Sequence, residues 1–235
     1  MRPISRQANS TTTRKSPEDL AARLLRDEPA LRSSLDFGPF VQQGQSAGPS
    51  LLIGDQSEIP LLQHALDMRR DYRMALLAQP SDVVIVRHRE AVYERYLDSY
   101  LGISDVTYLA PPDPCKDPIA VAARQDAYLS EILMKLAGGG FTLKSYITTQ
   151  NTWRLAQDLG NATQRIMHLS GPSARVSKRA NDKLWFTDLT RQIFDKTAVP
   201  PTMSGYTIAA AAAEIAYFAK SCDQVVAKLP DSAGS

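Results

Sequence analysis

The residues with the clearest chemical potential are two lysines in the C-terminal third of the chain. Lys183 follows Asn181 and Asp182 at the predicted start of a helix, and Lys228 precedes the small-residue loop at 229–235. A lysine ammonium beside such a loop offers a fixed cation and free backbone N–H groups, which are the groups that bind phosphate oxygens. Lys228 and the loop that follows it therefore form a candidate phosphate site.

Each lysine also has a plainer interpretation. A lysine in the first turn of a helix is commonly a surface residue, and a lysine at the end of a strand often protects an exposed edge. The pair gains weight because Pro200-Pro201 lies between the two lysines and the small-residue loop follows the second. We therefore take phosphate binding as the leading hypothesis for the pair.

Two further positions could bind a ligand because they follow predicted strands. Gly54-Asp55 comes directly after one apolar run, and Arg87 to Arg89 follow another. In open α/β sheets, ligands bind outside the carboxyl ends of the strands. Gly54-Asp55 could line a substrate pocket, and the alternative is a plain turn. Arg87 to Arg89 could bind an anion, and the alternative is a solvated loop.

Other reactive side chains do not form a recognisable site in the sequence. The only cysteines, Cys115 and Cys222, lie far apart and form no CxxC pair, which excludes a disulfide scaffold and a structural zinc site. The histidines stand alone without metal-ligand spacing: His64, His88 and His168.

A regular alternation of strands and helices begins at Ser50 and must position these residues. Short apolar runs joined by helical stretches of ten or more residues can only pair in parallel, through right-handed crossovers. We therefore expect an α/β fold with a parallel, Rossmann-like sheet. The predicted strands are 50–53, 82–86, 106–109 and 141–147, and the predicted helices are 60–77, 90–101, 118–137 and 151–159.

The flanking segments differ in composition. Residues 1–16 read as a disordered tail, Ser16-Pro17 begins a helix, and residues 36–49 read as a loop. Polar residues at 171–180 read as a linker. The rest of the chain is predicted to hold helices at 183–196 and 207–220 and a β-branched strand at 225–228.

The overall composition excludes several classes of protein. The chain has 235 residues, of which 43% are hydrophobic and 22% are charged, as in folded globular proteins. Four basic residues and no acidic ones lie in residues 1–16, so the folded part is close to neutral and lacks the basic face of a nucleic-acid binder. No secretory signal is evident and no apolar run reaches the roughly 18 residues needed to span a membrane. We expect a cytoplasmic protein.

The C-terminal motifs resemble the opening of an ATP-grasp domain. Asn181-Asp182-Lys183, the Pro200-Pro201 pair and the run VVAKLPDSAGS at 225–235 follow that family's pattern. The α/β part before them resembles a pre-ATP-grasp domain. The resemblance implies a pre-ATP-grasp domain with an N-terminal helix at 17–170, a linker at 171–180 and a partial ATP-grasp subdomain at 181–235.

What the resemblance implies about function is an ATP-dependent carboxylate–amine ligase. Such an enzyme phosphorylates a carboxylate to an acylphosphate, which an amine then attacks, with amino acids or peptides as the expected substrates and ATP and Mg²⁺ as cofactors. Lys183 would contact the ATP phosphates and Lys228 would bind the α- and β-phosphates. The loop that closes over the β- and γ-phosphates would begin with Ser232, Ala233, Gly234 and Ser235. No catalytic residue is assigned.

The resemblance also sets expectations about the chain as a whole. The family's Mg²⁺ ligands lie downstream of the segment that matches, so we expect an N-terminal fragment that is inactive alone. A homodimer fits the expectation, whereas a nucleic-acid or membrane partner does not. Two alternatives stay open: a non-catalytic Rossmann-like binding module, and a Rossmann-type transferase such as a glycosyltransferase.

Overall fold

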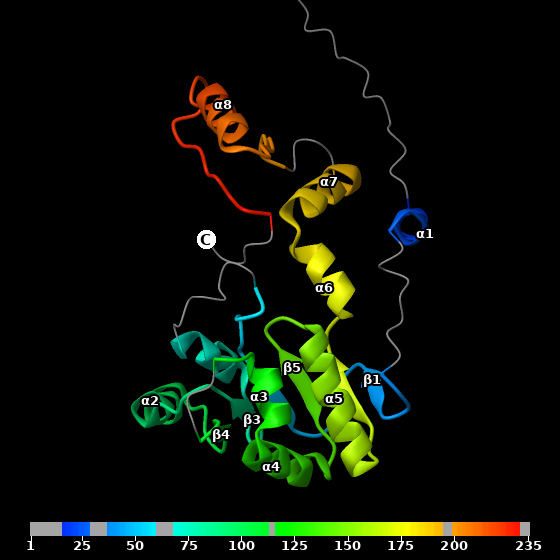
Figure 1. Ribbon diagram of the computed structural model, residues 1–235, viewed down its shortest axis with the longest axis vertical. Helices are drawn as coiled ribbons and strands as arrows, with labels where there is room; N and C mark the ends of the chain where they lie inside the picture. The colour runs from blue at the N-terminus through cyan, green and yellow to red at the C-terminus, as the bar shows by residue number, and fades with distance from the viewer. Residues whose placement is uncertain (1–15, 29–36, 60–67, 113–115, 195–198, 231–235) are drawn as a thin grey trace, which may run out of the picture. The chain divides into compact units, whose positions relative to one another are not determined.

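The computed structural model describes residues 16–28, 37–59, 68–112, 116–194 and 199–230 (Figure 1). The chain divides into two units, Met1–Ser33 and Ser34–Ser235. The first contains helix α1 (Pro17–Asp27), which begins as predicted: the Ser16 hydroxyl accepts a hydrogen bond from the Asp19 backbone N–H at 3.1 Å.

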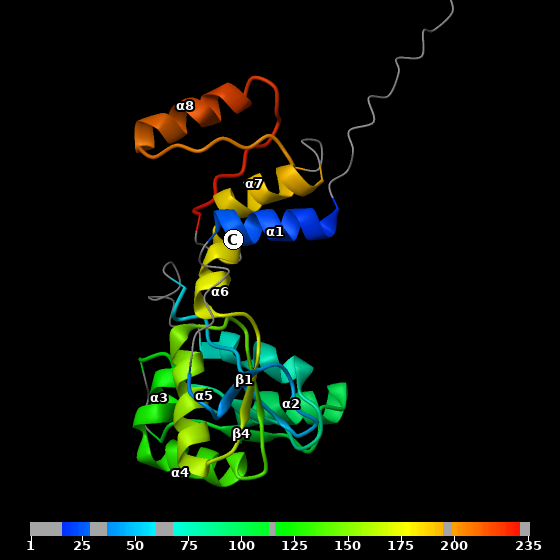
Figure 2. The ribbon, with the colours of Figure 1, turned by 90° about the vertical axis from the view of Figure 1, so that its right-hand side faces the viewer.

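The second unit contains a six-stranded sheet in which every neighbouring pair is parallel, in the order β1-β6-β5-β2-β3-β4 (Figures 1 and 2). This confirms the predicted α/β class with a parallel Rossmann-like sheet. The strands are β1 (Val41–Gln43), β2 (Ser50–Ile53), β3 (Val83–Ile85), β4 (Thr107–Leu109), β5 (Thr142–Ser145) and β6 (Met167–Ser170).

Two strands were not predicted, and both lie at one end of the sheet. Strand β1 falls within residues 36–49, which the sequence predicts as a loop, and β6 falls where no element is predicted. Strand β1 has the polar sequence Val-Gln-Gln and is only partly buried, because it forms the sheet edge and pairs with β6 alone. Its strand conformation comes from this pairing rather than from a hydrophobic pattern.

Helices cover both faces of the sheet and divide its core in two. On one face, the 3₁₀ segment η3 (Met68–Leu77) and α2 (Ala91–Leu101) pack on Leu52 and Val84. On the other, α3 (Ile119–Gln125), α4 (Ala127–Ala137) and α5 (Gln150–Thr163) pack on Leu51 and Leu143. Successive residues of a central strand thus face opposite cores, which explains its continuous apolar run.

Several helix predictions need correction. The single helix expected at 118–137 is two helices, because Asp126 ends α3 and its side chain caps α4 by accepting from the Leu129 N–H at 2.8 Å. Residues 68–77 of the helix expected at 60–77 form 3₁₀ turns, and 60–67 lie outside the described residues. The helix expected at 151–159 continues to Thr163, so Gly160 lies within α5 and Gln164 is the left-handed C-cap.

The face that α2 buries also differs from the expectation. The spacing of Val92, Tyr96 and Tyr100 in the sequence predicts that they share one apolar face, but all three side chains are exposed. The buried residues of the helix are Leu97 and Glu94. The tyrosines instead stack along the outer surface of the helix, with ring centroids 5.4 Å apart for Tyr96 and Tyr100. A tyrosine tolerates this position because its hydroxyl can face water.

The C-terminal part of the chain contains α6 (Ala174–Asn181), α7 (Lys183–Ile193) and α8 (Ile208–Phe218). Helix α6 occupies the segment expected to be a polar linker, and its N-cap is Ser173. The strand expected at 225–228 is wrong, because these residues form no strand and are exposed. No helix within the described ranges is long and apolar enough to cross a membrane.

Candidate functional site

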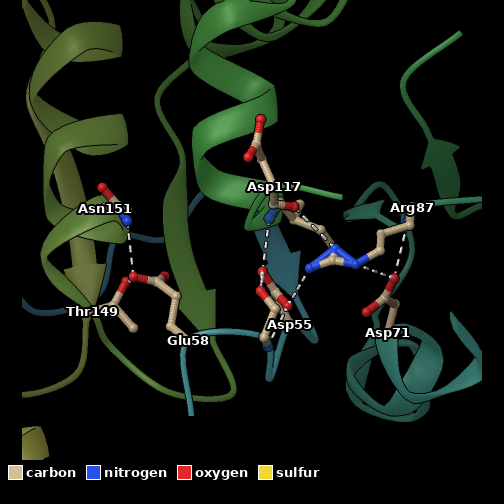
Figure 3. Close-up of polar contacts among 9 residues, drawn as sticks. Asp55, Glu58, Asp71, Arg87, Asp117, Thr149 and Asn151 are labelled. Carbon is tan, nitrogen blue, oxygen red and sulfur yellow. Dashed lines mark hydrogen bonds and ion pairs between the residues drawn. The ribbon is translucent and has the colours of Figure 1, made fainter. Parts of the chain in front are cut away.

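The sheet reverses its strand order between β2 and β5. The chain runs from β2 through β3 to β4 on one side, then returns to place β5 on the other side of β2. In open α/β sheets, the crevice outside the carboxyl ends of the strands at such a reversal is where ligands bind. The side chains that follow β2, β3 and β5 therefore define the candidate site, and Figure 3 shows that charged groups gather there.

Asp55, just past the end of β2, is a buried carboxylate with a complete set of hydrogen bonds. One oxygen accepts from Arg87 Nη2 at 2.7 Å and from the Ser57 N–H at 2.8 Å. The other accepts from the Ile119 N–H at 2.7 Å and from the Ser57 hydroxyl at 2.9 Å. Asp55 thus connects the end of β2 to Arg87, two residues beyond β3, and to the start of α3 (Figure 3).

Arg87 holds a second carboxylate in place. Its backbone N–H donates to Asp71 Oδ2 at 3.0 Å, and its guanidinium lies 4.0 Å from the same oxygen and donates to the Asp117 carbonyl at 3.2 Å. Burial raises the pKa of Asp71 to about 6, and the bonds from Arg87 only partly oppose this. One guanidinium therefore lies between two buried carboxylates, and burial makes Asp71 easier to protonate than an ordinary aspartate.

Glu58 connects the segment after β2 to the start of α5. Its carboxylate accepts from the Thr149 hydroxyl at 2.6 Å and from the Asn151 side-chain amide at 2.8 Å (Figure 3). Thr149 is itself the N-cap of α5. Burial raises the pKa of Glu58, against the opposing effect of these two hydrogen bonds. Glu58 occupies the helix N-terminus, a position that favours a negative charge.

This geometry settles the two loop hypotheses made from the sequence. Gly54-Asp55 is no plain turn, because Asp55 organises three segments. Arg87 does not offer a free anion site, because its guanidinium bonds Asp55 and the Asp117 carbonyl and its side chain is only 11% exposed. Arg89 pairs with Glu94, whose pKa burial would raise but hydrogen bonds from Arg89 and Tyr72 lower.

The strand order is Rossmann-like, yet the turn after β2 is unsuited to a dinucleotide phosphate. Phosphate-binding turns use glycines so that backbone N–H groups can approach the ligand. Here Asp55 and Glu58 place carboxylates at that edge, and Gly54 is already pressed against η3, where an added Cβ would lie 2.0 Å from the Asp71 carbonyl oxygen. The arrangement is therefore unlike that of a Rossmann-type transferase that binds its nucleotide at this turn.

The two lysines singled out from the sequence lie on segments that contact one another. The Lys183 backbone N–H donates to the Pro230 carbonyl at 3.0 Å. The Lys183 ammonium donates to the Leu229 carbonyl at 3.1 Å and to that of Pro230 at 3.4 Å. The start of α7 thus bonds the two residues that directly follow Lys228, which is exposed. Residues 232–235, the rest of the predicted site, lie outside the described part of the chain.

The remaining reactive residues do not add a site. No group of His, Cys, Asp and Glu side chains that could hold a metal ion occurs among the residues that the structure describes. Cys222 is a free, exposed thiol, and His88 is exposed. Cys115 and His64 lie outside the described ranges, and His168 is in β6, half-buried.

Sequence analysis missed Asp71, Glu58 and Thr149. Asp71 and Glu58 lie beside the stretch 60–67 in a region with weak helical periodicity, so no pattern distinguished them from surface acids. Thr149 carried a usable signal, because a threonine before a helix is a common N-cap. Their partners Arg87 and Asn151 come from distant segments, and only the fold brings them together.

Comparison with known proteins gives one match. A family model described as the Pre ATP-grasp domain matches residues 71–161, which run from Asp71 through β3, β4 and β5 into α5. Neither the curated proteins nor the solved structures that were compared gave a match. The matched range includes Asp71, Arg87 and Thr149 of the candidate site.

Proposed function

We propose, from the premise that residues 71–161 form a pre-ATP-grasp domain, that this chain takes part in ATP-dependent ligation of a carboxylate to an amine. The domain indicates an ATP-grasp ligase. In the proposed reaction, a carboxylate oxygen attacks the γ-phosphorus of ATP, ADP leaves, and an acylphosphate forms. An amine nitrogen then attacks the acyl carbon, the bond to the phosphate oxygen breaks, and the amide and inorganic phosphate are released.

The observation that carries the nucleotide half of this proposal is the contact between Lys183 and residues 229–230. It joins the start of α7 to the segment that contains Lys228, so two ammonium groups belong to one local structure. Ammonium groups from two elements can share the charge of a triphosphate, which is electrostatic rather than proton-transfer catalysis. Lys183, Lys228 and residues 232–235 are the groups that would hold the phosphates.

The described residues offer no group of side chains that fits a magnesium ion. Phosphoryl transfer in such ligases needs a divalent ion to neutralise the phosphate charge. The described part of the chain has no cluster of carboxylates that fits this role, since Asp55 and Asp71 are already bonded to Arg87. We derive no step through a metal ion held by these residues.

The substrate half of the proposal concerns the sheet. We place the carboxylate or amine substrate at the reversal between β2 and β5, and we take its class to be an amino acid or peptide. Glu58, Thr149 and the start of α5 lie at this edge and supply polar groups of both signs. Strand reversals of this kind are common ligand sites.

The test measures ATP binding by the natural protein, through equilibrium titration with a fluorescent ATP analogue. Lys228→Ala should raise the dissociation constant roughly tenfold or more, because a charge-assisted contact contributes about 1.5–3 kcal/mol. Lys220→Ala removes another exposed lysine of the same region and should leave binding unchanged. Equal affinities for the two variants would contradict the assignment.

A non-catalytic binding module is the second candidate, because the charged residues Asp55, Asp71 and Arg87 at the strand reversal are bonded to one another. The two candidates differ in turnover. A ligase releases ADP and phosphate only when both a carboxylate and an amine substrate are present, whereas a binding module binds its ligand with no ADP release. Measurement of ADP release in the natural protein separates them.

A further inference from the structure

We propose that Arg73, at the reversal between β2 and β5, binds the carboxylate of a free α-amino acid, with Gln56 accepting from the ligand ammonium. The choice of an amino acid as ligand rests on the proposed function. The site itself rests on four observations among the described residues: an arginine Nε without a hydrogen-bond acceptor, the stacking of that guanidinium on a tyrosine, a buried amide oxygen without a donor, and the local charge.

The guanidinium of Arg73 has a geometry suited to binding an anion. Its guanidinium lies over the ring of Tyr146, with the central carbon 4.2 Å from the ring centroid. A guanidinium that stacks on a ring uses its flat face, so the N–H groups at its edge are not engaged by the ring. These N–H groups can form bidentate hydrogen bonds with a carboxylate. The buried Nε of Arg73 has no hydrogen-bond acceptor among the described residues.

The stack lies at the strand reversal. Tyr146 directly follows β5, and its N–H donates to the Ile53 carbonyl of β2 at 2.8 Å. The segment η3, which carries Arg73, approaches the end of β2 so closely that Gly54 has no space for a Cβ beside the Asp71 carbonyl. Arg73 and Tyr146 therefore come from the two segments that flank the crevice favoured for ligands.

Gln56 supplies a second polar group that lacks a partner. It lies two residues beyond Gly54 and is only 7% exposed. Its side-chain oxygen has no hydrogen-bond donor in the described part of the chain. A buried amide oxygen without a donor is costly, and native proteins seldom leave one in that state. A ligand that donates a hydrogen bond would satisfy it.

Charge decides between a simple anion and an amino acid. Among the described side chains, Arg87 bonds Asp55 and Asp71, Arg73 interacts with Asp71, and Glu58 interacts with Asp55. When all of these groups are ionised, the carboxylates outnumber the guanidinium groups by one. A phosphate or simple carboxylate would add further negative charge to a partly buried site. A zwitterionic amino acid adds none, because its ammonium accompanies its carboxylate.

The experiment is isothermal titration of the chain, without ATP, with each of the twenty standard L-amino acids. At least one should bind. Arg73→Gln should then raise the dissociation constant roughly tenfold or more, because a charge-assisted contact is lost. Arg95→Gln, which removes an exposed arginine of α2, is the matched control and should bind as the unaltered chain does.

Analogues of the bound amino acid test both of its charges. Its amide, which lacks the carboxylate, and its N-acetyl derivative, which lacks the ammonium, should each bind roughly tenfold more weakly or worse. Tyr146→Ala should also weaken binding while Arg73 stays in place, and Tyr128→Ala, an exposed tyrosine of α4, should not. Circular dichroism of each variant verifies that the chain is folded.

Three results would overturn the proposal. They are no binding of any amino acid up to about 10 mM, equal affinity of the Arg73→Gln variant, or inorganic phosphate binding as tightly as the amino acid at the same site. None of these results depends on the lysines of the nucleotide proposal. Loss of ATP binding with intact amino-acid binding would contradict the nucleotide half alone.

Discussion

The sheet domain (residues 37–170) and the C-terminal region (residues 182–230) differ in how their side chains are buried. In the sheet domain, β2 and β3 are buried along their whole length. In the C-terminal region, α7 and α8 have no buried residue among those described. Ile208 is 92% exposed and Val226 is 74% exposed. The sheet domain makes its own core, whereas the apolar side chains of the C-terminal region remain largely uncovered.

Charged groups follow the same division. The sheet domain buries Asp55, Asp71 and Arg87 in a mutual network. In the C-terminal region, Lys228 is exposed, and the Lys183 ammonium donates to the backbone carbonyl of Leu229. Buried, paired charges hold segments together, whereas accessible cations are suited to ligands. Structural and ligand-binding roles of charge should therefore separate between the two regions.

The largest effect should come from Arg87→Met, which leaves two buried carboxylates without their cation. We expect a loss of about 3–5 kcal/mol in the free energy of unfolding, measured by chemical denaturation. Arg124→Met is the control, because its partner Asp158 is half exposed and such pairs contribute about 1 kcal/mol or less. Similar losses for both variants would show that burial does not distinguish these charges.

Gly54→Ala should follow, with a loss of about 3 kcal/mol in the free energy of unfolding. The added Cβ would lie 2.0 Å from the Asp71 carbonyl oxygen, so η3 would have to move. Gly139→Ala serves as the control, since its Cβ would meet the nearest atom at 3.6 Å. If the two variants unfold at the same denaturant concentration, η3 does not press on the end of β2.

These effects also show how much of the fold the sequence could predict. The apolar, β-branched run at Val83–Ile85 identified its strand, because a strand buried on both faces has little alternative. The same reasoning failed at Val225 and Val226, where β-branched residues form no strand. Propensity favours a strand only where another strand is available to pair with it.

The candidate site was predictable in part for a similar reason. Asp55 and Arg87 follow apolar runs, so their place at the carboxyl edge of the sheet could be inferred. Arg73 and Asp71 lie in η3, whose 3₁₀ turns lack the periodicity that would indicate which residues face the sheet. Their partners are set by tertiary packing, which a single sequence does not encode in a local pattern.

The titration of Asp71 should be a smaller effect, specific to the sheet domain. Because burial raises its pKa to about 6, the folded chain binds a proton more tightly than the unfolded chain does. Its contribution to stability is therefore greatest at low pH and is lost as the pH rises through about 6. Carbon-13 NMR of the carboxyl group should show this midpoint; titration near the ordinary value of 3.8 would contradict the burial argument.

The smallest effect should come from Phe186→Ser in α7. This side chain is 56% exposed, so its loss should change the free energy of unfolding by about 0.5 kcal/mol or less. Leu143→Ser in β5, at a fully buried position, is the comparison and should be far more damaging. A large loss for Phe186→Ser would indicate that the C-terminal region is packed more tightly than the side-chain exposure implies.

The pairing of the first strand with the last has a consequence for biosynthesis. Val41 is among the earliest residues of the sheet to leave the ribosome, but its partner is Met167. The Phe40 carbonyl likewise accepts from the Met167 N–H, at 2.8 Å. During translation, β1 must therefore wait until nearly the whole sheet domain has emerged. A nascent chain arrested before β6 would hold an unfinished sheet edge at β5, open to wrong partners.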